Sequence, residues 1–179
     1  STLTATRTFT ASGVVGTSLT SGSIYGTNYD DLIIVSQSQD QITVLKNNGA
    51  MLSGSTITTL VDSTTAGAPT CAAIGDFNGD GLNDVAVLNT SAGANYANVA
   101  YYLRTADGGL GASPTGKTLI SSTTTIGGLV AADLNGDRCS DLAYVCKSTN
   151  GNSYIGALIA NGKSSVFASP KLKSSSIVP

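Results

Sequence analysis

A segment that begins with aspartate and continues as an apolar strand occurs three times, with a period of 53 to 58 residues. The copies start at Asp31 (DLIIVSQ), Asp84 (DVAVLNT) and Asp141 (DLAYVCK). A second strand-like segment with a glycine turn follows each copy, at 42–49, 99–109 and 155–162. Such a repeat constrains the fold strongly, because each unit must form the same small structure and stack on its neighbours.

Two further segments complete each unit as a sheet. A strand of small apolar residues precedes the aspartate, as at 70–77 and 127–134, and a Thr-rich strand closes the unit, as at 55–62 and 116–123. Each unit is therefore predicted to be a four-stranded antiparallel sheet whose first strands are the most buried. Four-stranded units repeated in this way are typical of β-propeller blades.

The whole chain, residues 1–179, is predicted to be one all-β domain of the β-propeller type. Its three blades are expected at about 12–62, 70–123 and 126–172. Because a closed propeller typically has about 4 to 8 blades, we expect other copies of the chain, or other domains, to complete the array.

Residues 2–10 form one more candidate strand, which precedes the repeats. Thr occupies every even position, and Leu3, Ala5, Arg7 and Phe9 occupy the odd ones, a strict period of two. The strand could close a ring as the outer strand of the last blade, pair with a neighbouring copy, or be an ordinary edge strand of its own domain.

The segment DFNGDGLND, residues 76–84, has the spacing of a calcium loop. Side-chain oxygen donors stand at loop positions 1, 3, 5 and 9, a backbone carbonyl is available at position 7, and Gly81 allows the sharp turn. The predicted ligands are Asp76, Asn78, Asp80, Asp84 and the carbonyl oxygen of Leu82.

The segment DLNGDRCSD, residues 133–141, repeats this pattern between two strands, and Arg138 in place of the turn glycine is expected to put a cation beside the ion. The predicted ligands are Asp133, Asn135, Asp137, Asp141 and the carbonyl oxygen of Cys139. An EF-hand is excluded, because position 12 is Val87 or Tyr144 rather than Glu and both flanks are strands. The alternative for both loops is a cluster of Asx turns without metal.

The first repeat carries SIYGTNYDD, residues 23–31, at the equivalent place. Only Asp31, at position 9, remains of the ligand set. We therefore expect this blade to bind no calcium and its hairpin to be held by packing and hydrogen bonds.

The loops with their flanking strands, GDFNGDGLNDVAVLN and ADLNGDRCSDLAYV, resemble FG-GAP/VCBS repeats, the calcium-loop blades of integrin α-chain propellers and of many secreted proteins. The resemblance covers about 150 residues and is specific in the second repeat and weak in the first. It implies a β-propeller arrangement and calcium ligation at the two loops. It implies no single function, because such repeats occur in adhesion receptors, lectins, toxins and lyases.

Composition excludes several classes of function. The chain has no His, which removes the commonest general base and the usual triad base. A net charge of −2 without a basic run gives no footprint for nucleic acid or an anionic membrane. No apolar run approaches the roughly 18 residues of a membrane-spanning helix.

Three smaller features carry hypotheses. Cys71 and Cys146 stand five residues outside their loops, which suggests a bridge between adjacent blades and would leave Cys139 unpaired and partly exposed. Asn89 begins the only N-glycosylation sequon, expected in an exposed turn, and Ser and Thr are abundant enough for O-glycosylation. Seven Tyr give weak support for sugar binding.

The favoured function is a non-catalytic, extracellular structural or adhesive module with two calcium sites, assembled as a homo-oligomer or polymer or completed by further blades. Its partners would be copies of itself, glycans or other cell-surface proteins. The first alternative is a lectin with glycan pockets between blades. The second is a fragment of a secreted enzyme such as a polysaccharide lyase, whose spare carboxylates would be Asp30, Asp40, Asp62 and Asp107.

Overall fold

The computed structural model describes residues 13–49, 57–60, 68–91, 96–111, 113–121, 124–148, 153–162 and 167. Within these residues the chain forms eleven strands, β1 to β11, and no helix, so the all-β prediction is confirmed. The structure therefore contains, over the part it describes, no helix of the length and apolarity that crossing a bilayer requires.

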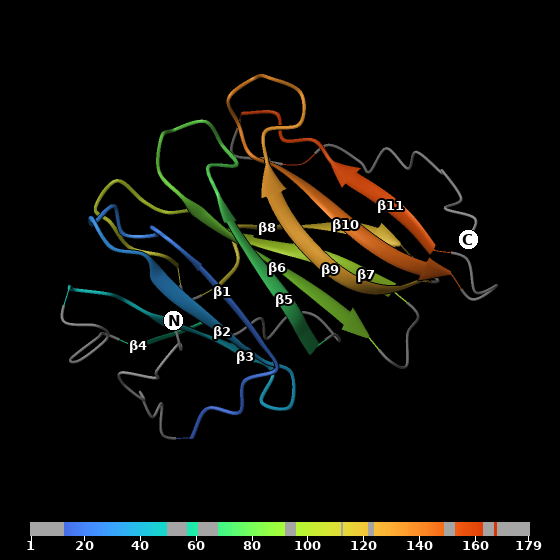
Figure 1. Ribbon diagram of the computed structural model, residues 1–179, viewed down its shortest axis with the longest axis horizontal. Coiled ribbons are helices and arrows are strands. Elements are labelled where there is room, and N and C mark those ends of the chain that lie inside the picture. The colour runs from blue at the N-terminus through green and yellow to red at the C-terminus, as the bar shows by residue number, and fades with distance from the viewer. Residues whose placement is uncertain are drawn as a thin grey trace, which may run out of the picture.

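The strands form three antiparallel sheets, each following the order of the chain (Figure 1). The first sheet contains β1 (Ser18–Gly22), β2 (Asp31–Ser36), β3 (Gln41–Leu45) and β4 (Ile57–Leu60). The second contains β5 (Ala68–Gly75), β6 (Asp84–Ser91), β7 (Tyr96–Tyr102) and β8 (Gly116–Ser121). The third contains β9 (Thr124–Ala132), β10 (Asp141–Ser148) and β11 (Ser153–Leu158).

The predicted fourth strand of the third repeat lies almost wholly outside the described residues. Phe167 is described, and it forms an isolated antiparallel bridge with Ala160. The predicted N-terminal strand, 2–10, also lies outside the described residues.

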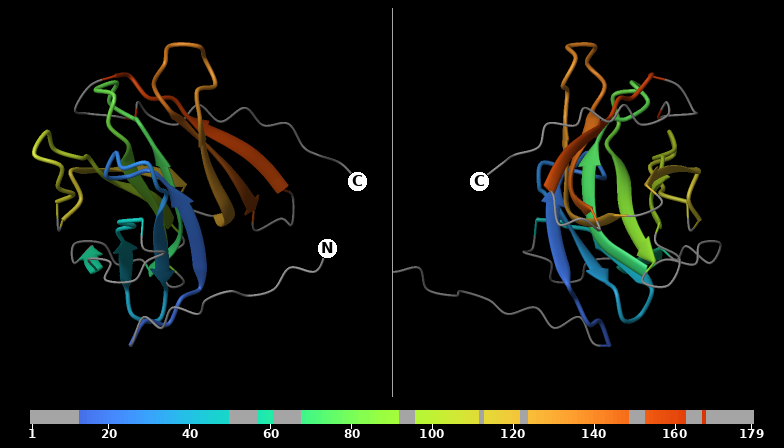
Figure 2. Two further views of the ribbon diagram at one scale, coloured as in Figure 1. Left: turned by 60° about the vertical axis from the view of Figure 1, so that its left-hand side comes forward. Right: turned by 90° about the vertical axis from the view of Figure 1, so that its right-hand side faces the viewer.

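The second sheet lies between the other two and contributes to two hydrophobic cores (Figure 2). One core joins the first and second sheets through Ile33, Val44 and Tyr102, among others. The other joins the second and third sheets through residues such as Leu88 and Leu142. Because consecutive side chains of a strand point to opposite faces, a sheet covered on both faces is apolar at nearly every position, as DVAVL of β6 is.

The expectation that the first strand of each sheet is the most buried is wrong. The second strands are more buried: four of the six residues of β2 are buried, and Val85 to Asn89 of β6 are all buried. By contrast β1 has no buried residue and β9, over its described side chains, only Leu129. The first strands are edge strands of their sheets, and of the three only β5, which lies between β1 and β9, has several buried residues.

Candidate metal centre

Each hairpin that joins the first two strands of a sheet is fixed by the aspartate at the start of the second strand. In the second sheet, Asp84 is fully buried and both its carboxylate oxygens accept backbone hydrogen bonds. Oδ2 accepts from Phe77 N at 3.1 Å, and Oδ1 accepts from Arg104 N, just beyond β7, at 2.8 Å. Asp84 therefore ties the start of the loop to the end of the third strand.

The equivalent aspartates make the same contacts in the other two sheets, and we call Asp31, Asp84 and Asp141 the anchoring aspartates. Asp141 accepts from Leu134 N at 3.0 Å and Ala160 N at 2.8 Å. Asp31 accepts from Ile24 N at 2.9 Å, Tyr25 N at 3.0 Å and Asn47 N at 2.7 Å. The sequence indicated that these aspartates anchor the hairpins only indirectly. Position 9 is still Asp in the segment 23–31, where the other predicted ligands are absent.

The tip of the loop at 76–84 wraps around the carboxylate of Asp76. Asp76 Oδ1 accepts from Gly79 N at 2.7 Å and from Asp80 N at 3.2 Å, and Oδ2 accepts from Gly81 N at 2.8 Å. Asn78 Nδ2 donates to Asp80 Oδ2 at 2.9 Å. Loop positions 1, 3 and 5 are thus held in one compact turn, which Phe77 attaches to the core by packing on Phe167 at a ring distance of 5.5 Å.

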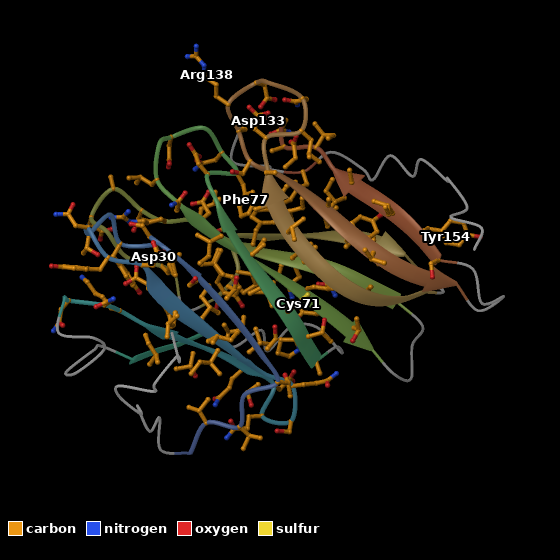
Figure 3. The ribbon with its side chains drawn as sticks, viewed as in Figure 1. Asp30, Cys71, Phe77, Asp133, Arg138 and Tyr154 are labelled. Carbon is orange, nitrogen blue, oxygen red and sulfur yellow. The ribbon has the colours of Figure 1, made fainter. Side chains whose placement is uncertain are left out.

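The loop at 133–141 repeats three of these four hydrogen bonds. Asp133 accepts from Gly136 N at 2.7 Å and Arg138 N at 3.0 Å, and Asn135 Nδ2 donates to Asp137 Oδ2 at 2.8 Å. Arg138 has a φ of 72°, close to the 82° of Gly81, so a non-glycine residue takes up the left-handed turn. Its side chain projects outward from the loop, so it does not put a cation beside the predicted ligands (Figure 3).

The structure brings the predicted ligands of each loop together in part. Positions 1, 3 and 5 share hydrogen bonds at the exposed tip, whereas the anchoring aspartate lies beneath them with both oxygens bonded to N–H groups. Within the described residues, no three Asp or Cys side chains converge closely enough to form a metal cluster by themselves. The donor set nevertheless fits calcium, because it consists of carboxylate, amide and carbonyl oxygens alone, the carbonyls being those of Leu82 and Cys139.

In the loop at 76–84, the surroundings of Asp84 disfavour the charged form of its carboxyl group when no cation is bound. Burial raises the pKa of Asp84 to about 6, the N–H groups of Arg104 and Phe77 lower it in part, and the charges of Asp80 and Asp76 raise it further. At the exposed tip of the second loop, hydrogen bonding from Gly136 N, together with other loop N–H groups, lowers the pKa of Asp133. A divalent cation among these oxygens would offset the mutual repulsion of the carboxylates.

The hairpin of the first sheet is held without such a carboxylate cluster, as expected. Ser23 Oγ donates to Thr27 O at 3.2 Å, and Ile24 is fully buried in the core between the first two sheets. With the three hydrogen bonds to Asp31, these contacts close a loop in which Ser, Tyr and Thr replace the predicted ligands.

The loops of successive sheets also contact one another through loop position 8. Asn83 Nδ2 donates to Ser23 O at 2.7 Å, and Ser140 N donates to Asp76 O at 2.6 Å. Cys139 is buried rather than partly exposed, because its thiol lies against Gly79, where a Cβ would come within 3.0 Å of Sγ. Position 1 of each earlier loop is thus bonded to position 8 of the next.

Three smaller hypotheses are not supported. Cys71 is a free thiol, which contradicts the suggested bridge to Cys146. Asn89 lies inside β6, buried, and its Nδ2 is 3.3 Å from Asn98 Oδ1, so the expected exposed turn is wrong. Tyr101 and Tyr102 are both buried, because both faces of the second sheet are covered, and this pair gives no support for sugar binding.

The spare carboxylates lie in turns or at strand ends where the structure describes them. Asp40 has a φ of 56° in the turn between β2 and β3, and Asp107 accepts a hydrogen bond from the Thr105 hydroxyl. Asp30 immediately precedes β2, and Asp62 lies outside the described residues.

Comparison with protein families gives two overlapping matches. The family described as FG-GAP-like repeat matches residues 24–87 and 76–144. Both matches include the predicted calcium loop at 76–84, and the second also includes the loop at 133–141. Among curated proteins, none shows significant similarity to the chain.

Proposed function

Because the chain belongs to the FG-GAP-like repeat family, we propose that it is a non-catalytic structural or adhesive module of the cell exterior, stabilised by calcium. In this proposal the blades are completed by further copies of the chain or by further blades. The observation that carries the calcium part is the duplicated loop: two tips, 57 residues apart, share one hydrogen-bond pattern around Asp76 and Asp133.

Calcium would be held by the ten ligands predicted from the sequence, five in each loop. Its charge would neutralise the carboxylates and tie the exposed tip to the anchoring aspartate beneath it. Each loop tip is already held in a compact turn, because Asp76 and Asp133 accept hydrogen bonds from the N–H groups of their own loops. Extracellular modules of this kind bind calcium at about 10⁻⁴ to 10⁻³ M, which suits a permanent stabiliser better than a switch.

A non-catalytic role fits the chemistry of the described carboxylates. The anchoring aspartates are buried and accept two or three backbone hydrogen bonds each, so their oxygens serve the fold. With no His in the sequence, acid-base chemistry would have to use other groups.

Thermal unfolding in calcium and in chelator tests the proposal. At about 10 mM calcium, a site with the affinity above stabilises by about 1.4 to 2.7 kcal/mol, which raises Tm by about 3 to 10 °C in a domain of this size. Asp80→Ala and Asp137→Ala should each remove the gain of one site, while Asp30→Ala, outside both predicted calcium loops, should leave it intact. A Tm that is the same with calcium and with chelator would refute calcium stabilisation.

A further inference from the structure

One face of the third sheet is apolar and open to solvent. Val130 of β9 is 61% exposed, Val145 of β10 50% and Ile155 of β11 46%. In the strand register, Val130 lies opposite Ala143, which lies opposite Ala157, and Val145 lies opposite Ile155. These five residues are contiguous across three strands, carry no charge, and are called the trailing patch.

The equivalent face is covered in the other two sheets. The residues two and four places after the anchoring aspartate are Ile33 and Val35 in the first sheet, Ala86 and Leu88 in the second, and Ala143 and Val145 in the third. The first four are at most 1% exposed, because each packs against the following sheet. The third sheet therefore presents a face of the same composition that has no following sheet within the described residues.

The first sheet is open on its opposite face. Leu19 of β1 is 64% exposed, and Leu32 and Ile34 of β2 are half-buried; we call these three residues the leading patch. Leu19 and Ile34 are direct partners in the register of β1 and β2. At the positions of Leu32 and Ile34, the other sheets carry Val85 and Val87 or Leu142 and Tyr144, all of which are buried against the preceding sheet.

We propose that a second copy of this chain packs its leading patch on the trailing patch. The contact would repeat, between molecules, the sheet-on-sheet packing that occurs twice within the chain. In each case the face equivalent to the trailing patch packs on the face of the next sheet that is equivalent to the leading patch. Both patches are apolar and uncharged, as the centre of a stable protein interface is. The inference rests on the assembly part of the proposed function and assigns the surfaces to it.

The proposed contact is heterologous, since different surfaces of the two copies meet. Each copy then keeps one free patch, so association continues until a ring closes or a filament grows. This property separates the proposal from a symmetric dimer through either patch alone.

Sedimentation velocity on the full chain over a concentration series, in calcium, tests the proposal. The wild-type chain should form species larger than a dimer as its concentration rises. Val145→Lys on the trailing patch and Leu19→Lys on the leading patch should each weaken association at least about tenfold, because the lysine would have to be desolvated. Leu119→Lys is the matched control, because Leu119 is 59% exposed on β8 and outside both patches, and it should associate as the wild type does.

Mixing the two variants gives the sharpest result. The intact leading patch of Val145→Lys fits the intact trailing patch of Leu19→Lys, so the mixture should form dimers and stop there. Melting curves of the same samples show that each variant is folded, and Ile155→Lys replaces Val145→Lys if that variant is not.

Several outcomes would overturn the interface. A wild-type chain that stays monomeric at every concentration would do so, as would variants that associate like the wild type or a mixture that does not dimerise. If the wild type is monomeric but associates after removal of 168–179, that segment covers the patch instead of a second copy. A calcium-independent Tm in samples that still assemble would contradict the calcium part of the proposed function and leave this interface standing.

Discussion

The carboxylate of Asp31 should be one of the largest single contributors to the stability of the first sheet, although no metal is expected there. It is fully buried and accepts hydrogen bonds from Ile24 N, Tyr25 N and Asn47 N at 2.7 to 3.0 Å. A hydrogen bond to a charged group contributes about 1.5 to 3 kcal/mol, and a buried donor left without a partner costs a similar amount. Two of the three hydrogen bonds are only partly buried, so we expect Asp31→Ala to lower the free energy of unfolding by about 4 kcal/mol.

The assay is thermal and urea unfolding followed by circular dichroism, with and without calcium. A loss of about 4 kcal/mol lowers Tm by about 8 to 16 °C in a domain of this size. Asp31→Asn keeps one acceptor oxygen and should lose less. Because Asp31 acts through backbone hydrogen bonds alone, its loss should be the same in calcium and in chelator.

Asp80→Ala is the comparison that makes the result decisive. Its carboxylate sits at the exposed loop tip, bonded to Asn78 Nδ2 and Leu82 N, and its removal should matter mainly when calcium is present. The reasoning is refuted if Asp31→Ala costs less than about 1 kcal/mol. It is also refuted if the cost disappears in chelator, because the loop at 23–31 would then be a metal site.

Two backbone predictions can be checked in the same unfolding experiments. Arg138→Gly should stabilise the protein by about 1 kcal/mol, because a φ of 72° strains any residue with a Cβ; Arg138→Ala, which keeps that strain, should not, and equal effects would point to the charge instead. Gly156→Ala should cost about 1 to 3 kcal/mol, because its Cβ would overlap the ring of buried Tyr144. Gly127→Ala, where nothing lies within 4 Å of the new Cβ, is the control, and a neutral Gly156→Ala would show that the ring can move.

The sequence predicted the parts of this fold that are local. The strands that begin at Asp31, Asp84 and Asp141 are where the repeat placed them, because the alternation of residues and the turn glycines act over a few positions. The loop at 76–84 was equally readable, since its oxygen donors are fixed by spacing within nine residues.

Most of the errors concern how the sheets and loops cover one another. Asn89 and Cys139 were expected to be exposed. Asn89 instead lies beside Asn98 of the paired strand β7, in a sheet whose two faces are both covered, and Cys139 is covered by Gly79 of the preceding repeat and by Gly162. Strand patterns give the two faces of a sheet but not which face has a neighbour. The burial of first strands was misjudged for the same reason, because it depends on how many blades surround them.

The hydrogen bonds between Asn83 and Ser23 and between Ser140 and Asp76 make the hairpin tips one continuous rim. Ser140 stands between two predicted ligands of its own loop, and its partner Asp76 is the first ligand of the loop before. An interaction that orders either loop therefore restricts the motion of the other, because both loops contribute to the hydrogen bond between Ser140 and Asp76. The repeat at 23–31 keeps only one of the predicted ligands, and the hydrogen bond from Asn83 to Ser23 joins its loop tip to the neighbouring loop.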